Sequence, residues 1–293
     1  MSSSALRPNP SLEATATGKA LGPRAGVVHH PSRGPSAFPA SAPQLKRSAA
    51  SKRGNMSEWP NHSSWSALRE GDFNIGGKLY RFEVVDCGDL YLPSGRLVAC
   101  DPFAGMDRGG NPYIQVPKGR FPVRVTIADV SGKADSSHIR EAYASLILSR
   151  SAEAIRRVLT PLRKGEESPA ISEGEFIGFG VDAGTACFVD DRALESSMPP
   201  EEEWLEGLFE NDDPASWFAR MDNPEHIRKG IANIPLPLAQ SGENLVLFHS
   251  GWGDGVYPVV GGYDQDGNLV AVHIDLLVVL GETNDDEAAE PQA

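Results

Sequence analysis

Apolar residues that alternate with polar ones, or that cluster in short runs, are spread along most of this chain. Both patterns are typical of β-strands. At residues 121–130, the side chains of Val123, Val125 and Ile127 recur with the period of two that a half-buried strand has. Residues 138–149 have a helix-like composition, but their apolar positions also fit a period of two, which favours a strand. Further strands are predicted at residues 78–85, 96–99, 175–180, 186–189, 245–248, 256–263 and 269–280.

Turn-forming residues separate these strands. Pro93, Ser94 and Gly95 predict a turn that pairs residues 78–85 with residues 96–99 as a hairpin. The segment Asp182–Gly184 predicts a turn between two other strands. Asp266–Gly267 is the strongest short hairpin signal and predicts that the last two strands are neighbours.

Helical signals are confined to one region. Residues 199–209 open with two prolines followed by Glu201–Glu203, which suits the positive end of a helix dipole. Residues 214–221 predict a second short helix. The sequence therefore predicts an α+β fold: a β-rich, largely antiparallel sheet domain over residues 56–282, with one or two short helices.

The two ends differ from this middle part. Residues 1–55 are rich in Ser, Pro and Ala and hold eight Lys or Arg against one Glu, a formal charge of +7. Because they show no hydrophobic periodicity, they predict a disordered basic extension. Two alternatives stay open: an organelle transit peptide, and a start codon placed too early, with Met56 as the first residue of the domain. Residues 283–293 predict a disordered acidic tail.

Charge and cysteine usage narrow the possible partners. The formal net charge of −13 leaves −20 for the residues after the basic extension. So acidic a body repels nucleic acid and anionic membranes, and favours a basic protein, a small cationic ligand or a metal ion. There is no apolar stretch of membrane-spanning length, which predicts a soluble protein. Cys87, Cys100 and Cys187 form no CxxC pair, which argues against a zinc cage or a disulfide framework and favours a cytoplasmic location.

Residues 249–258, reading HSGWGDGVYP, form the most distinctive segment. Its alternating glycines allow positive φ angles or a close approach of another group. Trp252 and Tyr257 flank Asp254, an arrangement that could wall a pocket for a cationic or ribose-like ligand. The alternative is that both aromatic rings belong to the core and cover a backbone that has no side chains at its glycines.

Several blocks of the sequence together resemble a known family. They read LPSGRLVACDP, VPKGRFPV, GFGVDAGTACFVD, SGWGDGVYPVVGGYDQDG and HIDLLVV, in that order, from about residue 88 to residue 279. On these blocks the chain is similar to the uncharacterised family known as domain of unknown function 4241. The resemblance implies a shared fold and a set of characteristic residues, but it implies no reaction, cofactor or partner.

Four of these five blocks carry an aspartate beside glycine, proline or an apolar strand. Asp275 stands out because it interrupts an apolar run, where a carboxylate is costly unless it is paired, hydrogen-bonded or metal-bound. If several of the acids converge, their oxygens would suit Mg²⁺ or Ca²⁺. The alternatives are that Asp275 points to the solvent face or accepts hydrogen bonds from turn amides, and that Asp101 and Asp182 start or cap turns. The six acids are Asp101, Asp182, Asp190, Asp254, Asp264 and Asp275.

Other catalytic patterns are weak. His249 could serve as a ligand or a base, or be an ordinary histidine at a strand end, and the same alternatives hold for His273. Ser250 follows His249 directly, and adjacent strand residues point to opposite faces, so the two do not form a nucleophile–base pair in a regular strand. Asp264 and Asp266 resemble part of a calcium loop, but Gly262 and His273 stand at loop positions 1 and 12, where Asp and Glu are required, so a hairpin turn is favoured. Cys187 lies in an apolar strand and is interpreted as core packing.

Two functions from different classes follow. The first is a binding or interaction module whose pocket is formed by Ser250, Trp252, Gly253, Tyr257, Gly184 and Asp101. The second is a hydrolase in which Asp254 is the general base or a metal ligand, His249 is its proton partner, and Asp182 and Asp275 complete a carboxylate cluster with Asp101. The second hypothesis requires carboxylate oxygens on the order of 4–6 Å apart and at least one raised pKa.

Overall fold

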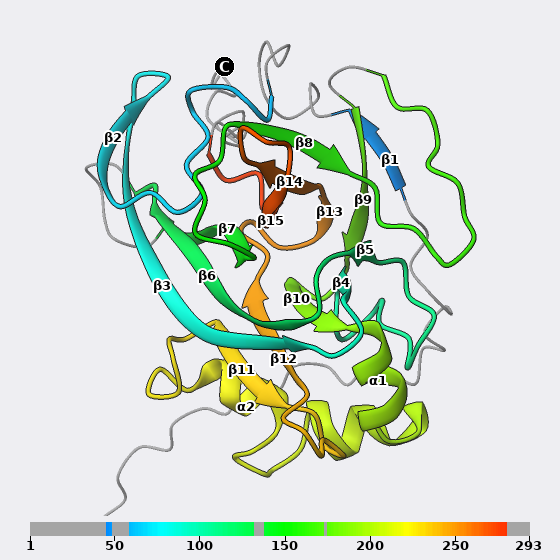
Figure 1. Ribbon diagram of the computed structural model, residues 1–293. Coiled ribbons are helices and arrows are strands. Elements are labelled where there is room, and N and C mark those ends of the chain that lie inside the picture. The colour runs from blue at the N-terminus through cyan, green and yellow to red at the C-terminus, as the bar shows by residue number, and fades with distance from the viewer. Residues whose placement is uncertain (1–44, 49–58, 132–137, 173–174, 280–293) are drawn as a thin grey trace, which may run out of the picture. The chain divides into compact units, whose positions relative to one another are not determined.

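Antiparallel sheets form the framework of the protein in the computed structural model (Figure 1). The structure describes residues 45–48, 59–131, 138–172 and 175–279. All of them belong to one of the two compact units of the chain, Phe38–Ala293. The other unit, Met1–Ala37, lies outside the described residues.

The largest sheet in the described residues has seven strands in the order β2-β3-β6-β7-β15-β14-β8, and Figure 1 shows its long strands β3 and β6 curling together. Every pairing in it is antiparallel. In the same order, its strands are Gly71–Ile75, Lys78–Leu92, Gly119–Asp129, Ile139–Ile147, Leu269–Asp275, Val259–Tyr263 and Ile155–Leu159.

A five-stranded sheet, in the order β11-β12-β10-β4-β5, is buried on both faces. In β12, Val246 and Phe248 join the core shared with the large sheet, while Leu245 and Leu247 join a second core beneath the helices. Because side chains alternate along a strand, two buried faces require a continuous apolar run, which is what this segment has. The five strands are Ile231–Pro235, Asn244–His249, Thr185–Asp190, Arg96–Cys100 and Ile114–Gln115.

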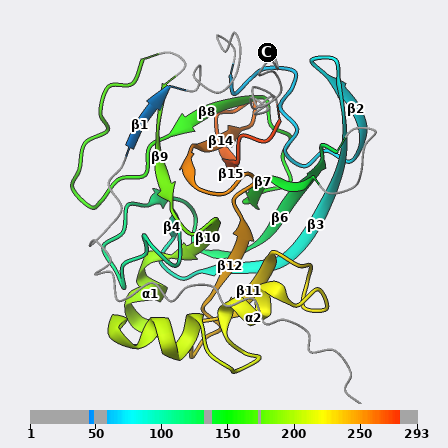
Figure 2. The same cartoon turned by 180° about the vertical axis from the view of Figure 1, so that it is seen from behind.

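A smaller three-stranded sheet, β1-β9-β13, completes the strands, and short helices cover the second core. In Figure 1 and Figure 2, helices α1 (Asp191–Ser197) and α2 (Trp217–Asp222) lie on the same side as β11. Asp190 caps α1 by accepting hydrogen bonds from the amides of Arg192 and Ala193. The strands of the small sheet are Leu45–Ser48, Glu175–Val181 and Gly255–Tyr257.

Residues that follow Trp59 cover polar side chains on the large sheet. The Trp59 indole donates a hydrogen bond of 3.0 Å to Asp275, and the ring of Trp65 packs against that of His273 at 5.5 Å between centroids. His273 lies 2.8 Å from the Ser145 hydroxyl and 2.7 Å from the Glu153 carboxylate. Both Asp275 and His273 are fully buried, so these partners offset their desolvation.

The structure confirms the predicted fold class, a β-rich α+β protein with antiparallel sheets and few short helices. The ambiguous segment at residues 138–149 is a strand, β7, and Asp266–Gly267 lies in the turn of the β14–β15 hairpin. The predicted helix at residues 214–221 corresponds to α2. Elements that the sequence reasoning missed are α1, β1, β2, β5, β8 and β11.

One predicted pairing is wrong. Residues 78–85 and 96–99 do not form a hairpin, because β3 continues to Leu92 within the large sheet while β4 pairs with β10 and β5 in the other sheet. The buried Asp190 carboxylate accepts hydrogen bonds from the amides of Ser94 and Gly95. This contact directs the chain from one sheet to the other, and a local turn pattern cannot reveal it.

Three boundaries also need correction. The strand predicted at residues 256–263 is two strands, β13 and β14, which belong to different sheets and meet at Pro258, a residue without an amide hydrogen. The helix predicted at residues 199–209 is a 3₁₀ turn at Glu201–Glu203 followed by a π-helical turn at Leu205–Phe209. The last strand, β15, ends at Asp275.

Most of the predicted basic extension, and the whole of the predicted acidic tail at residues 283–293, lie outside the described residues. Only strand β1 and its antiparallel pairing with β9 are described within the extension. None of the helices in the described part of the chain combines the length and hydrophobicity that crossing a bilayer requires.

Candidate functional site

Two turns that are far apart in the sequence meet at the ends of the smaller sheets. The amide of Ser250 donates to the carbonyl oxygen of Gly184 at 3.0 Å, and the amide of Gly184 donates to the Asp254 carboxylate at 3.0 Å. Gly184 has a φ of +62°, and a Cβ atom added there would lie 4.0 Å from the Cα atom of Gly253. We call residues 182–184 together with residues 250–257 the loop junction.

Asp101 anchors one side of the loop junction. Its carboxylate accepts hydrogen bonds from the amides of Asp182 and Ala183 at 2.8 and 2.7 Å, and from those of Phe103 and Ala104 at 2.8 and 3.2 Å. Burial raises the pKa of Asp101, an effect that outweighs the opposite influence of the four amides. With four backbone partners, this carboxylate fastens the turn rather than facing a ligand.

The glycine-rich segment passes very close to its neighbours. Gly251 has a φ of +65°, and a Cβ atom there would lie 2.7 Å from the Val278 side chain. The Tyr257 hydroxyl lies 2.7 Å from the carbonyl oxygen of Ser250 and 2.6 Å from that of Gly253. Burial raises the pKa of Tyr257 to about 12. Tyr257 and the buried Ser250 therefore hold the segment together from inside.

Trp252 is the prominent exposed side chain of the loop junction, with 48% of its surface accessible. The Arg140 guanidinium lies 4.9 Å from the centroid of the indole ring, a cation–π distance. The ring of His138 is 6.2 Å away. These neighbours orient the indole and leave much of it accessible.

The predicted acids are only partly brought together. Asp182 and Asp254 are both exposed at the loop junction. Asp275 is fully buried, and its carboxylate accepts hydrogen bonds from the Trp59 indole and from the amide of Leu277. Among the residues that the structure describes, no group of three His, Cys, Asp or Glu is arranged to hold a metal ion.

His249 faces an acid that the sequence reasoning missed. A Cβ atom added at Gly230, where φ is +90°, would lie 2.6 Å from the His249 Nδ1 atom and 3.1 Å from an oxygen of Glu141, so both groups converge on this glycine. Burial raises the pKa of Glu141 to about 7 and lowers the pKa of His249. Glu141 stands at the start of the buried part of β7, directly before a largely apolar run. An acid in that position was the feature of the sequence that could have identified Glu141 as a candidate.

Comparison with known proteins gives a single positive result. The family model described as "Protein of unknown function (DUF4241)" matches residues 90–274, close to the range over which the sequence blocks resemble that family. No functionally curated protein matches the chain, and no solved structure does. Since the match covers well over half of its length, the chain belongs to the DUF4241 family.

Proposed function

We propose that this protein is a non-catalytic binding module and that the loop junction is its recognition surface. The observation that carries the proposal is the exposure of Trp252. The other four tryptophans of the chain are at most 8% exposed, whereas Trp252 is 48% exposed. An accessible tryptophan is the kind of side chain that anchors protein interfaces, because covering it removes a large apolar area from water.

The backbone below Trp252 supports the same interpretation. Hydrogen bonds donated by the hydroxyl groups of Ser250 and Tyr257 to backbone carbonyls hold the segment together, and Asp254 ties it to the neighbouring turn. A segment already fixed in shape loses little conformational entropy when a partner binds. Trp252 is therefore presented on a preorganised support.

The charge of the surroundings favours a cationic partner. Asp182 and Asp254 are exposed on the same junction, within a body whose formal charge after the basic extension is −20. A basic protein would gain long-range attraction from this body and apolar contact from Trp252. A small cationic ligand would use the same groups.

Replacing Trp252 by alanine is expected to weaken partner binding at least tenfold, because interface tryptophans commonly contribute about 2 kcal/mol or more. The full-length wild-type chain and the Trp252→Ala variant would each be immobilised at low salt, and the amounts of partner protein that they retain would be compared. Leu238→Ala is the matched control, since Leu238 is 51% exposed and lies outside the loop junction. Retention that is equal for wild type and Trp252→Ala would refute the proposal.

The acidic side chains provide a second test of the same proposal. Asp254→Asn keeps an oxygen that can accept the Gly184 amide but removes the charge. Binding to a basic partner is then expected to lose part of its salt dependence. Binding whose salt dependence is unchanged in this variant would contradict a cationic partner.

A hydrolase is the second candidate, and the pair Glu141 and His249 favours it more than the aspartates do. Asp101 and Asp275 are held by hydrogen bonds to other groups. By contrast, burial raises the pKa of Glu141 and lowers the pKa of His249, so both shifts favour the uncharged form and pair a protonated acid with an unprotonated base. A panel of chromogenic ester and phosphoester substrates tests this candidate. The hydrolase hypothesis requires that the wild-type protein turns over a substrate of the panel and that Glu141→Gln abolishes this turnover. If the wild-type protein turns over none of the substrates, the hydrolase hypothesis is rejected.

A further inference from the structure

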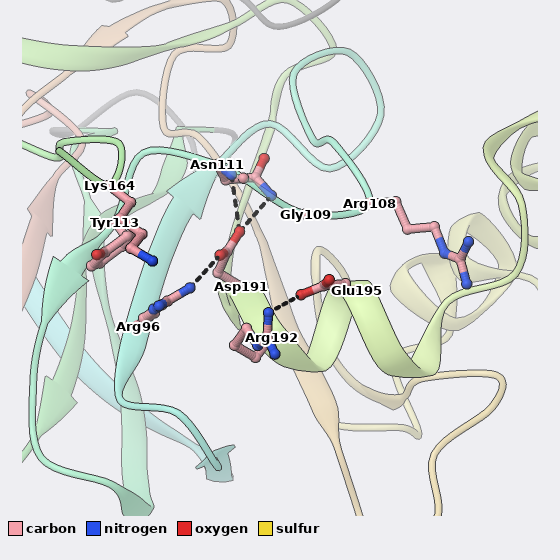
Figure 3. Close-up of a pocket in the computed structure, with 10 residues that line it drawn as sticks. Arg96, Arg108, Gly109, Asn111, Tyr113, Lys164, Asp191, Arg192 and Glu195 are labelled. Atoms are coloured by element: carbon pink, nitrogen blue, oxygen red, sulfur yellow. Dashed lines mark hydrogen bonds and ion pairs between the residues drawn. The ribbon is translucent and has the colours of Figure 1, made fainter. Parts of the chain in front are cut away.

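A pocket of about 420 Å³ lies away from the loop junction, between α1 and the loop that precedes β5 (Figure 3). Four stretches of chain contribute to it: Arg96 at the start of β4, residues 108–113, the turn that holds Lys164, and residues of α1. The volume falls in the range typical of small-molecule sites. Its lining residues are Arg96, Arg108, Gly109, Gly110, Asn111, Tyr113, Lys164, Asp191, Arg192 and Glu195.

The lining is positively charged, unlike the protein as a whole. Four of its side chains are cationic and two are acidic, in a chain of formal charge −13. Both acids already have partners. The Asp191 carboxylate accepts from the amide of Asn111 at 2.9 Å and lies 3.6 Å from the Arg96 guanidinium, and Glu195 pairs with Arg192. The pocket therefore holds more positive charge than its own carboxylates neutralise.

Lys164 is one of the two lining cations without an acidic partner among the described residues, and Arg108 is the other. No carboxylate among the described residues lies within 4.0 Å of the Lys164 ammonium group, and Figure 3 shows Lys164 beside Tyr113 at one side of the pocket. Arg108 lies at the opposite side, where its Nε atom donates to the carbonyl oxygen of Met198 at 3.1 Å. The ring of Tyr113 lies 5.1 Å from the Arg96 guanidinium and provides an apolar wall.

The backbone adds further donors. No described group accepts a hydrogen bond from the amides of Gly109 or Gly110, although both residues line the pocket. Gly110 has a φ of +81°, and a Cβ atom there would meet nothing within 4 Å, so this residue borders open space. Consecutive amides without acceptors, in a turn with positive φ, are a common way to bind an oxyanion.

From these observations we propose that the pocket binds a small molecule carrying a phosphate group, which Lys164, Arg96 and the Gly109–Gly110 amides receive. The lining has an excess of two positive charges. A phosphate monoester carries about −1.5 to −2 charges at pH 7 and neutralises this excess, whereas a single carboxylate leaves half of it uncompensated. A long polyanion such as nucleic acid is disfavoured because the acidic body around the pocket repels it.

Isothermal titration of the full-length chain with inorganic phosphate tests the inference, at pH 7.5 and constant ionic strength. Saturable binding is expected, with the dissociation constant at least about tenfold higher in Lys164→Ala, because the variant loses a charge-assisted hydrogen bond to the phosphate. Lys229→Ala is the matched control. Lys229 is an exposed lysine outside the pocket, and its substitution is expected to leave the constant within about twofold.

Three outcomes would overturn the inference: no saturable binding to the wild-type chain, equal binding by wild type and Lys164→Ala, or acetate binding as tight as that of phosphate. Circular dichroism of each variant distinguishes a lost site from a lost fold. Because none of the lining residues belongs to the loop junction, failure here leaves the proposed binding surface around Trp252 unaffected.

Discussion

Substitution of Asp101 by alanine is expected to lower the free energy of unfolding by about 3–5 kcal/mol, because four backbone amides lose their acceptor and a buried donor left unsatisfied costs about 1–3 kcal/mol. Asp101 is 1% exposed, and its carboxylate is the acceptor for the amides of Phe103, Ala104, Asp182 and Ala183. Without it, the turn at residues 182–184 loses its connection to β4. Urea denaturation followed by circular dichroism measures the effect.

Asp254→Ala is the control for this prediction. Asp254 belongs to the same loop junction but is exposed, and its one described hydrogen bond is the 3.0 Å contact with the Gly184 amide. Its removal is expected to cost about 1 kcal/mol or less. If Asp101→Ala were as mild as Asp254→Ala, the carboxylate of Asp101 would not be a structural anchor, and a role in ligand binding or catalysis would become the better interpretation.

Replacing Glu141 by glutamine is expected to stabilise the protein by about 2–3 kcal/mol above pH 8. Burial raises the pKa of Glu141 from 4.5 to about 7, so the folded state holds this proton more tightly than the unfolded chain does. The stabilisation from the proton is complete below pH 4.5 and is lost as the pH rises through 7. Glutamine carries no charge in either range and avoids that loss.

Urea midpoints at pH 5 and pH 8.5 test this prediction. The difference between Glu141→Gln and wild type should be small at pH 5 and large at pH 8.5, whereas Glu202→Gln, at an exposed glutamate, should change stability by less than about 0.5 kcal/mol at both. A difference independent of pH would mean that Glu141 is not buried as a titrating acid. If Glu141→Gln also abolished a measured hydrolytic activity, the loss of stability caused by burying Glu141 would be explained by its role in that activity.

Local pattern alone was enough to predict the type of most elements. The alternation around Val125 and the apolar run ending at Phe248 identify strands, and Asp266–Gly267 specifies its own hairpin, because each depends on contacts among neighbours in the sequence. The distinctive blocks also identified the family. The glycines of residues 251–255 predicted a close approach, which the contacts of Gly251 confirm.

Which strand belongs to which sheet was decided by tertiary contacts. The turn at Pro93–Gly95 reads as a hairpin, but the Asp190 carboxylate, nearly a hundred residues away in sequence, holds it between two sheets. Pro258 looks like an interruption within one strand, yet it separates strands of different sheets. The energies of such long-range hydrogen bonds are not expressed in the pattern of nearby residues.

The same reason explains what could be predicted about the sites. The sequence by itself determined that the loops rich in Asp and Gly are the candidate functional sites, and it placed Trp252 in one of them. Only the tertiary structure decided that Asp101 bonds to backbone amides while Trp252 is exposed, and that Lys164 lies across a pocket from Arg108. Exposure, pairing and concavity arise from residues distant along the chain, so they are properties of the folded protein and not of any single segment.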